Sequence, residues 1–337
     1  MSPHPSGTLL GLGVVDPVLE SDLALGMEAV EEALRAAVRS DYPFVTEASR
    51  HLVDAGGKRF RPLLVLLAAQ FGDPWAPGVV PSAAVVELTH LATLYHDDVM
   101  DEADLRRGAA SANARWDNTV AILTGDFLFS RASDILADLG PEAVRIQART
   151  FERLCTGQIR EAMGPGPADD AVAHHLRVLA DKTGSLIATS GRFGALMSGA
   201  DPRVVEVLTE FGERIGVAFQ LADDIVDIAS DSSESGKTPG TDLREGVPTL
   251  AGLIALSGAD SLGDLDRLSD LLRRPLDDDD EHREALALLR AHPALGQARA
   301  EARHWADEAR ECLKELPAGP ARDALESMCD FVVTRTG

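Results

Sequence analysis

The sequence predicts an all-α fold, and three observations support that prediction. Hydrophobic residues make up 45% of the 337 residues but aromatic residues only 4%, and Ala and Leu dominate, which is typical of helical proteins. Apolar residues recur at steps of three and four along most of the chain. No convincing run alternates apolar and polar residues as a half-buried strand does, and no short internal repeat is present.

The predicted helices follow one another from the amino end. Residues 21–40 start with a capping Ser or Asp and continue with a helical apolar period. Residues 81–104 predict a long, largely buried helix, with Pro81 tolerated near its start and Gly108 beyond its end. Further helices are predicted over residues 118–139, 141–163, 170–198, 202–230 and 249–256 and through the carboxyl-terminal third.

Four polar or glycine-rich breaks separate these helices: "DAGGKRFRP", "GPGPADD", "SDSSESGKTPGTDLREGVP" and "RRPLDDDDEH". None is long enough to link two domains, so we expect one helical domain over residues 1–337, with residues 1–20 poorly ordered. The acids of the last break do not follow an apolar helical run, so we expect a solvated loop there rather than a metal site.

The net charge of -23 argues against nucleic acid as a partner, because phosphate backbones attract basic surfaces. An anionic ligand would need local cations or metal ions. Cys155, Cys312 and Cys329 are scattered without metal-ligand spacing, which indicates a reduced, cytoplasmic chain. No segment reaches the roughly 18 apolar residues of a membrane span, and the amino terminus lacks the basic flank of a signal peptide.

Two acidic motifs share one spacing and each follows an apolar helical run. Carboxylates four residues apart on a helix repel each other, so a cation would convert that repulsion into binding. Mg²⁺ fits, because it prefers hard oxygen ligands and shares one or two carboxylates with substrate phosphate. A solvated acidic face is the alternative for either motif alone. The six carboxylates belong to Asp97, Asp98 and Asp101 in "YHDDVMDEADLRRG" and to Asp223, Asp224 and Asp227 in "GVAFQLADDIVDIASD".

Lysine is rare in this chain, and three of its four lysines lie beside a glycine or one residue from it. Lys58, Lys182 and Lys237 occur in "GGKRFRP", "DKTGS" and "SGKTPGTD". An ammonium group on a flexible stem, near backbone that a ligand can approach closely, suits a phosphate group. Lys314 lies in an ordinary polar helical pattern and is expected at the surface.

Taken in order from Gly56 to Gly246, "GGKRFRP", "HDDVMDEADLRRG", "DKTGS", "FQLADDIVD" and "GKTPGTDLREG" resemble the motifs of trans-type isoprenyl diphosphate synthases, the polyprenyl synthetase family. The resemblance implies an isoprenoid synthase-type bundle of antiparallel helices around a deep central cavity, usually in a homodimer. It also implies Mg²⁺-dependent, head-to-tail condensation of isopentenyl diphosphate with an allylic diphosphate and release of pyrophosphate.

The resemblance assigns expected roles to the matched residues. The six acids would hold several Mg²⁺ ions shared with the allylic diphosphate. That diphosphate would also contact Arg106, Lys182 and Lys237, with Thr183 and Gln220 at the reacting end; Lys182, Thr183, Gln220 and Lys237 are thus the expected catalytic residues. Isopentenyl diphosphate would be held by Lys58, Arg61, His90 and Arg107.

Some positions have a plainer interpretation. His90 and Gln220 could be polar residues satisfied by helix packing, and we expect Arg59 to form a surface ion pair outside the site. One residue departs from the family pattern: Val247 stands where many members have a further lysine after "GTDLREG". That departure puts one contact to the allylic diphosphate in doubt.

Product length depends, in this family, on bulk in the helix before the first acidic motif. The chain has Thr89, Ala92 and Thr93 there, none of them aromatic. Tyr95 lies two residues before Asp97, about 160° from the expected wall. We therefore expect a medium or long product of roughly six to ten isoprene units.

Three alternatives stay open. A geranylgeranyl or farnesyl diphosphate synthase is the first, because Phe127 or Phe129 on the following helix could close the cavity. A non-catalytic subunit of a heteromeric synthase would keep the fold but lose acids or cations that this chain retains. A terpene cyclase would need Asn, Ser or Thr, and Glu in its second motif, and "ADDIVDIASD" does not supply them.

Overall fold

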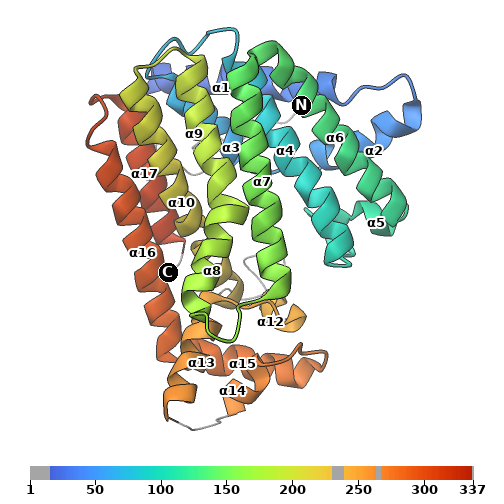
Figure 1. The fold of residues 1–337 in the computed structure, drawn as a ribbon, viewed down its shortest axis with the longest axis vertical. Coiled ribbons are helices and arrows are strands. Elements are labelled where there is room, and N and C mark those ends of the chain that lie inside the picture. The colour runs from blue at the N-terminus through green and yellow to red at the C-terminus, as the bar shows by residue number, and fades with distance from the viewer. Residues whose placement is uncertain (1–15, 230–238, 263–266, 336–337) are drawn as a thin grey trace. The chain divides into compact units, whose positions relative to one another are not determined.

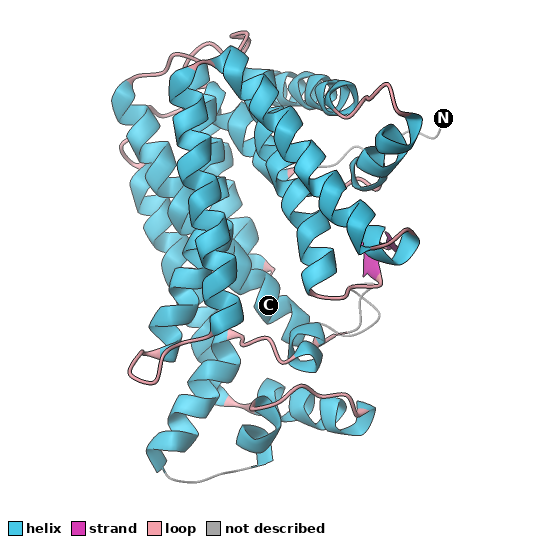
Figure 2. Cartoon of the chain, turned by 45° about the vertical axis from the view of Figure 1, so that its right-hand side comes forward, coloured by secondary structure: helices cyan, strands magenta, loops and turns pink. Residues whose placement is uncertain are grey.

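The computed structural model describes residues 16–229, 239–262 and 267–335, which are helical almost throughout (Figures 1 and 2), so the all-α prediction is confirmed. The elements are α1 (Pro17–Ala37), α2 (Pro43–Asp54), α3 (Phe60–Ala69), α4 (Val79–Met100), β1 (Leu105–Arg106), β2 (Ala109–Ala110), α5 (Ala112–Arg115), α6 (Asn118–Leu139), α7 (Pro141–Met163), α8 (Ala171–Leu179), the π-helical turn η2 (Ala180–Gly184), α9 (Ser185–Met197), α10 (Pro202–Ala229), α12 (Thr241–Glu245), α13 (Leu250–Leu262), α14 (Arg267–Leu272), α15 (Asp279–Ala291), α16 (Pro293–Leu313) and α17 (Pro320–Thr334).

The first helix begins earlier than the sequence predicts. Asp16 caps α1, since its carboxylate accepts hydrogen bonds from the amides of Val18 (3.0 Å) and Leu19 (2.8 Å), and Pro17 occupies the first turn. Helix α1 therefore starts inside residues 1–20, which were expected to be poorly ordered. Residues 1–15 of that segment lie outside the described residues.

The acidic run of "RRPLDDDDEH" is not a loop throughout, so that prediction is wrong for its second half. Asp278 caps α15 by accepting from the amides of Asp280 (2.8 Å) and Glu281 (3.0 Å). Asp279, Asp280 and Glu281 form the first turn, where carboxylates interact favourably with the positive end of the helix dipole. The acids thus start a helix.

The chain divides into two compact units. Unit 1 comprises residues 1–151, 186–212 and 312–327, and unit 2 comprises residues 152–185, 213–311 and 328–337. A single domain over residues 1–337 stays a prediction.

In unit 1, α4 packs against α1, α3 and α6 (Figure 1). Helix α4 is buried along most of its length, as its apolar sequence predicts. Tyr95 points toward α2, where its hydroxyl donates to the Ala48 carbonyl (2.6 Å) and accepts from the Leu52 amide (3.2 Å). This ring is therefore a packing residue between α2 and α4.

In unit 2, one apolar stripe fixes the orientation of α10. Val217, Leu221, Ile225 and Ile228 recur at steps of three and four and belong to a buried cluster with residues of α8, α13 and α16. At about 100° per residue, Asp223 and Asp227 point away from that stripe and Asp224 lies at its border. Core packing thus decides which way the second acidic motif faces.

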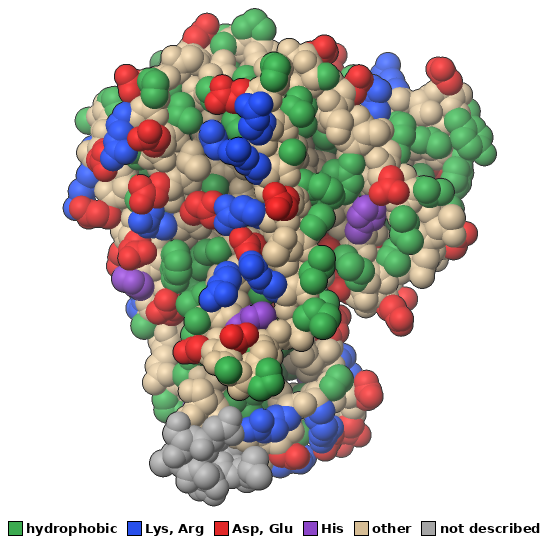
Figure 3. Space-filling view, in the orientation of Figure 1, with side chains coloured by type: hydrophobic (Ala, Val, Ile, Leu, Met, Phe, Trp, Pro, Cys, Tyr) green, Lys and Arg blue, Asp and Glu red, His purple; other side chains and the backbone are tan. Residues whose placement is uncertain are grey.

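None of the helices in the described ranges is both long and apolar enough to cross a membrane. On the face drawn in Figure 3, basic side chains are intermingled with acidic ones rather than gathered in one patch.

Candidate active site

A short hairpin follows the first acidic motif. Strands β1 and β2 pair antiparallel, and the turn between them is Arg107 (φ 53°) and Gly108 (φ 76°). Two consecutive left-handed residues match the type I′ turn of tight hairpins. The sequence does not predict this hairpin, because Gly108 is its only local signal and the commoner Asn-Gly or Asp-Gly pair is lacking.

Asp98 is the buried member of the first acidic motif. Its side chain is fully buried, and Oδ1 accepts from Arg106 Nε at 2.6 Å. Arg106 Nη2 also lies 3.9 Å from Oδ2 of Asp101. Burial raises the pKa of Asp98, and the charge of Arg106 opposes that rise. Oδ2 of Asp98 is buried and accepts no hydrogen bond from any described residue, so it retains an open ligand position.

Arg107 folds back onto the "GGKRFRP" loop. Its guanidinium donates to the carbonyl oxygens of Leu52 (3.0 Å) and Gly56. A Cβ at Gly57 would lie 2.8 Å from Cζ of Arg107, and Gly57 has φ +133°. Glycine is therefore required at residue 57 for this contact between the two motifs.

Arg59 is not at the surface, so the predicted surface ion pair is wrong. Its side chain is 5% exposed and pairs with Glu31 Oε1 (2.6 Å) and Glu87 Oε1 (2.8 Å). Glu87 is itself 2% exposed and also lies 3.9 Å from Nη2 of Arg107. One buried carboxylate of α4 therefore serves both arginines.

Four arginines surround His90. Burial, followed by the charges of Arg61, Arg107, Arg106 and Arg59, holds the pKa of His90 well below its usual value, so the imidazole is neutral. The structure thus brings His90, Arg61 and Arg107 together as predicted, next to Arg106. This is the local cationic region that an anionic ligand needs in an acidic protein.

Lys58, also predicted for this group, is exposed in the loop before α3.

Asp224 is the most buried acid of the second motif. Its pKa is raised well above the usual aspartate value by burial first, and then by the charge of Asp242 and the other two acids of the motif. A hydrogen bond from Gln220 Nε2 (3.0 Å) partly opposes that rise. A bound cation would relieve the same repulsion.

Asp242 is a site residue that sequence reasoning missed. Its amide lies 3.3 Å from Oδ2 of Asp227, and its charge acts on Asp224. The signal was available, since Asp242 is the acid of the quoted motif "GTDLREG".

Arg335 was also missed, and no local signal marks it. Its Nη2 lies 2.6 Å from Oδ1 of Asp223, and its guanidinium packs over the rings of Phe219 and Phe331 at 5.3 and 5.4 Å.

The predicted helix over residues 170–198 is interrupted by η2, which carries two predicted catalytic residues. Nζ of Lys182 lies 2.5 Å from Oε2 of Glu161. The Thr183 hydroxyl donates to Gln220 Oε1 (3.1 Å), and Gln220 continues the chain to Asp224. Gln220 is therefore a hydrogen-bonded link between Thr183 and the second acidic motif.

An ionic cluster holds η2 against α7. Asp181 accepts from Nε of Arg153 (3.0 Å) and from Arg160. Arg153 also donates to the Ala180 carbonyl (3.2 Å), which accepts the amide of Ser185 as well. A Cβ at Gly157 would lie 2.8 Å from the Lys182 amide nitrogen, so only glycine lets the two segments approach this closely.

The acidic residues fit a hard divalent cation. Each motif offers carboxylate oxygens, and Asp98 keeps one of them buried without a partner among the described residues. In the described ranges no three His, Cys, Asp or Glu side chains form a ready metal cluster. Water and diphosphate oxygens would complete the coordination, as is usual for Mg²⁺.

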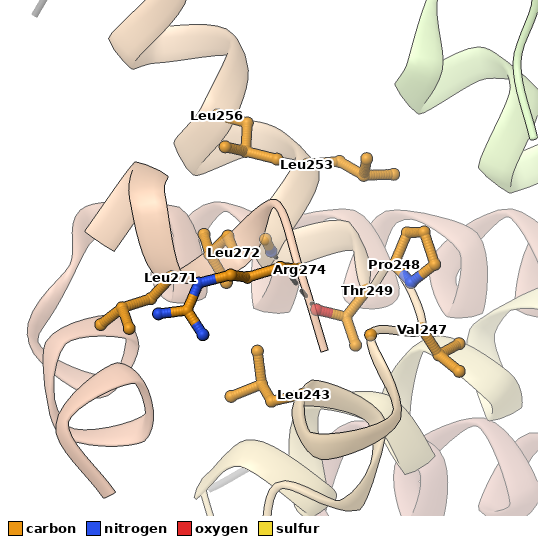
Figure 4. Close-up of a pocket in the computed structure, with 11 residues that line it drawn as sticks. Leu243, Val247, Pro248, Thr249, Leu253, Leu256, Leu271, Leu272 and Arg274 are labelled. Carbon is orange, nitrogen blue, oxygen red and sulfur yellow. Dashed lines mark hydrogen bonds between the residues drawn. The ribbon is translucent and has the colours of Figure 1, made fainter. Parts of the chain in front are cut away.

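Two further positions were singled out in the sequence, Lys237 and Val247. Lys237 lies outside the described residues. Val247 borders a cavity of about 80 Å³ in unit 2, lined also by Leu243, Thr249 and Arg274. Figure 4 shows the Val247 side chain pointing away from Leu243 and Arg274.

A larger cavity, of about 440 Å³, lies in unit 1 beside α4, α6 and α7. Phe129, one of the two phenylalanines that could close the cavity in the first alternative of the sequence analysis, lines this cavity. Its ring centroid is 4.4 Å from that of Phe151. Among the described residues, Thr89, Ala92 and Thr93 do not line it directly; Thr89 is linked to it through a hydrogen bond from Gln147 (2.8 Å).

Comparisons with known proteins agree on one family. Residues 42–289 match the family model "Polyprenyl synthetase". The chain is 49% identical over 334 residues, covering 99% of both chains, to a nonaprenyl diphosphate synthase of Mycobacterium tuberculosis.

Solved structures with the same fold include two that cover most of this chain. A geranylgeranyl pyrophosphate synthase of Corynebacterium glutamicum, complexed with calcium and isoprenyl diphosphate, has a TM-score of 0.84 and 44% identity over 96% of this chain and 99% of its own. A decaprenyl diphosphate synthase of Rhodobacter capsulatus has a TM-score of 0.85 and 35% identity over 95% and 99%.

Proposed function

Since the chain belongs to the polyprenyl synthetase family, we propose that it condenses isopentenyl diphosphate head to tail with an allylic diphosphate and releases pyrophosphate. The observation that carries the proposal is the contact between Asp98 and Arg106, one of the four arginines whose charges act on His90. A buried carboxylate with an open oxygen adjoins Arg106, and Arg61 and Arg107 gather around His90 nearby. Carboxylates for a metal and cations for diphosphates are thus close together.

Mg²⁺, when bound with the allylic diphosphate, would stabilise the negative charge that develops on the departing pyrophosphate. The chain's own residues then have three tasks. Arg106, Lys182 and Lys237 bind the allylic diphosphate, Thr183 and Gln220 orient its reacting end, and Lys58, Arg61, His90 and Arg107 hold isopentenyl diphosphate.

The reaction needs no protein nucleophile. The allylic carbon–oxygen bond breaks, and its electron pair leaves with pyrophosphate. The double bond of isopentenyl diphosphate attacks the allylic carbon, which forms the new carbon–carbon bond and leaves a tertiary carbocation. That carbocation loses a proton to pyrophosphate, and the electrons of the broken carbon–hydrogen bond form the new double bond. Alignment of both substrates supplies much of the acceleration, because it replaces an encounter in solution.

For product length we propose a medium or long trans-polyprenyl diphosphate. The lack of aromatic bulk at Ala92 and Thr93 and the nonaprenyl and decaprenyl relatives support this proposal. A geranylgeranyl diphosphate synthase is the second candidate, because Phe129 narrows that cavity and the Corynebacterium glutamicum relative is named for that product.

We further propose a cytoplasmic homodimer with one domain over residues 1–337 and Mg²⁺ as its metal. Gel filtration with light scattering measures the mass in solution, and a monomeric enzyme at full activity would contradict the dimer.

The test is an assay of the purified chain alone with Mg²⁺, radiolabelled isopentenyl diphosphate and allylic starters of increasing length. We expect pyrophosphate release, its loss with EDTA, and a chromatographic product longer than geranylgeranyl. A product that stops at geranylgeranyl supports the second candidate, whereas turnover only with a second polypeptide supports the heteromeric subunit.

A further inference from the structure

A buried histidine of α8 faces the second acidic motif. His175 lies on the same side of α8 as Val178 and Leu179, because residues three and four apart share a helix face, and all three side chains are buried. Nε2 of His175 lies 3.9 Å from Oδ2 of Asp224 and has no hydrogen-bond partner among the described residues. Buried polar atoms are usually paired, so this nitrogen calls for an explanation.

The carboxylate of Asp224 is within reach of that nitrogen. A hydrogen bond between them needs about 2.9 Å, so a movement of about 1 Å by either side chain closes the gap. Burial keeps bulk water away from Nε2, so the nitrogen is satisfied only by a neighbouring protein atom. On the other side of the carboxylate, Oδ1 of Asp224 already accepts from Gln220 Nε2 at 3.0 Å. A bond from His175 would therefore fix both oxygens.

His175 is a neutral hydrogen-bond donor. Burial, and then the charge of His174, lowers the pKa of His175 to about 4, so the ring carries a single proton at neutral pH. The negative charge of Asp224 favours the tautomer with that proton on Nε2. A neutral donor holds a carboxylate without the positive charge that would repel a metal ion, unlike the guanidinium of Arg335, which lies 2.6 Å from Asp223.

Orientation of a carboxylate affects how well it binds a metal ion. Each carboxylate oxygen has two lone-pair directions, so one N–H on each oxygen of Asp224 leaves the other direction open to a cation. Partners that orient a metal ligand in this way typically change metal affinity by about 10- to 100-fold.

We propose that His175 is a positioning residue of the second acidic motif: its Nε2–H holds Oδ2 of Asp224 and so orients that carboxylate for a divalent cation. The inference rests on the proposed function, because it takes this motif as a metal site. It adds a residue from α8 that touches neither substrate.

His175→Leu tests the proposal, because it removes the donor and leaves an apolar side chain on the buried face of α8. We expect binding of Mn²⁺ with inorganic pyrophosphate, measured by titration calorimetry, to weaken about tenfold. The Mg²⁺ concentration that gives half-maximal condensation should rise by a similar factor. The KM for isopentenyl diphosphate should stay within about twofold of wild type, because its proposed ligands belong to unit 1.

Two further variants separate positioning from packing. His175→Gln keeps an N–H donor and should bring the Mn²⁺ affinity back to within about threefold of wild type. The matched control is His174→Leu, because His174 lies on the same helix and its Nε2 contacts the Arg160 carbonyl (3.2 Å) instead of the acidic motif. This control should leave the Mn²⁺ affinity unchanged.

A second measurement uses the wild-type protein, so it does not depend on how His175→Leu folds. Nuclear magnetic resonance of isotope-labelled histidine should show the proton of His175 on Nε2. The signal, identified by its loss in His175→Gln, should shift when Mg²⁺ and pyrophosphate are added.

Four outcomes overturn the inference. Wild-type Mn²⁺ affinity in folded His175→Leu, an equal loss of affinity in His174→Leu, or a proton on Nδ1 of His175 in the metal-bound protein each refutes the role of His175 and leaves the proposed function intact. Absence of pyrophosphate release by the wild-type chain refutes the proposed function and this inference with it.

Discussion

Glu87 is a carboxylate shared by two arginines whose backbone is left-handed. Arg59 (φ 50°) and Arg107 (φ 53°) both have left-handed backbone, which is uncommon for residues other than glycine and costs free energy. The buried carboxylate of Glu87 lies 2.8 Å from Arg59 Nη1 and 3.9 Å from Arg107 Nη2. Its charge offsets the burial of both guanidiniums.

Glu87→Gln should therefore destabilise the protein strongly. Removing this carboxylate leaves Arg59 with Glu31 as its remaining carboxylate partner and weakens the compensation of two buried charges, which costs about 3 kcal/mol. Urea denaturation measures the change. Glu47→Gln is the matched control, because its pair with Arg115 (2.7 Å) is exposed and should contribute less than about 1 kcal/mol. Equal losses in the two variants would contradict the role given to Glu87.

His175 makes stability depend on pH. Burial, and then the charge of His174, lowers its pKa to about 4 from the ordinary 6.5. Between these values the unfolded chain binds a proton that the folded protein does not. Stability should therefore fall as pH is lowered from about 6.5 to about 4, by about 3 kcal/mol in all.

Measurement of the unfolding free energy against pH checks this slope. His175→Gln should reduce the slope, whereas His304→Gln, at an exposed position, should leave it unchanged. An unaltered slope in His175→Gln would assign the pH dependence to other groups.

At the scale of elements, η2 is a turn that the chain stabilises with charges. A π-helical turn is rare and occurs mostly at functional sites. Here Arg153 and Arg160 bind Asp181, and Lys182 and Thr183 follow directly. The ion cluster thus positions two residues that we propose bind and orient the allylic diphosphate.

Asp181→Asn should loosen η2 without touching the substrate. We expect the KM for the allylic diphosphate to rise about tenfold while the KM for isopentenyl diphosphate changes little. Steady-state kinetics with each substrate varied separately measures both values. Asp134→Asn, whose pair with Arg131 is 3.4 Å long and exposed, is the control. A parallel rise in both KM values would indicate general unfolding instead.

Helix α4 provides the second prediction at this scale. Ala92 is fully buried, so Ala92→Phe must push aside its neighbours at a cost of about 1–3 kcal/mol. If this part of α4 borders the growing chain, the product should become shorter. Chromatography of the products decides, and Ala84→Phe, also fully buried on α4 but two turns earlier, should be destabilising without shortening the product.

At the scale of the whole molecule, the two acidic motifs belong to different units. The kinetics of single and double variants test whether the two motifs act as one unit in catalysis. Asp101→Asn and Asp223→Asn should each lower kcat/KM by about 100-fold.

The double variant should be little worse than either single variant, because residues that act as a unit are strongly non-additive. Multiplied losses in the double variant would mean that the motifs act independently.

Much of the fold was predictable because its signals are local. The predicted ranges 118–139 and 141–163 coincide with α6 and α7, and the predicted range 202–230 ends one residue beyond α10. The strand pair β1–β2 and the turn η2 were missed, because neither has a distinctive sequence signal of its own.

The residues of the candidate site were likewise predictable from the sequence only in part. His90, Arg61 and Arg107 were predicted from motifs and do gather, as do Thr183, Gln220 and Asp224. Asp242 could have been predicted from the motif "GTDLREG". Arg335 joins the second acidic motif from a segment far along the chain, so only the fold reveals it.

The sequence by itself determined the helical class, the boundaries of α6 and α7 and the residue types of the site, because periodicity, capping and motif spacing act over a few residues. Only the tertiary structure decided that Arg59 is buried against Glu31 and Glu87, and that Gln147 meets Thr89 beside a cavity. Those contacts join residues far apart in the chain, and the packing of whole helices, rather than any local pattern, brings them within hydrogen-bonding distance.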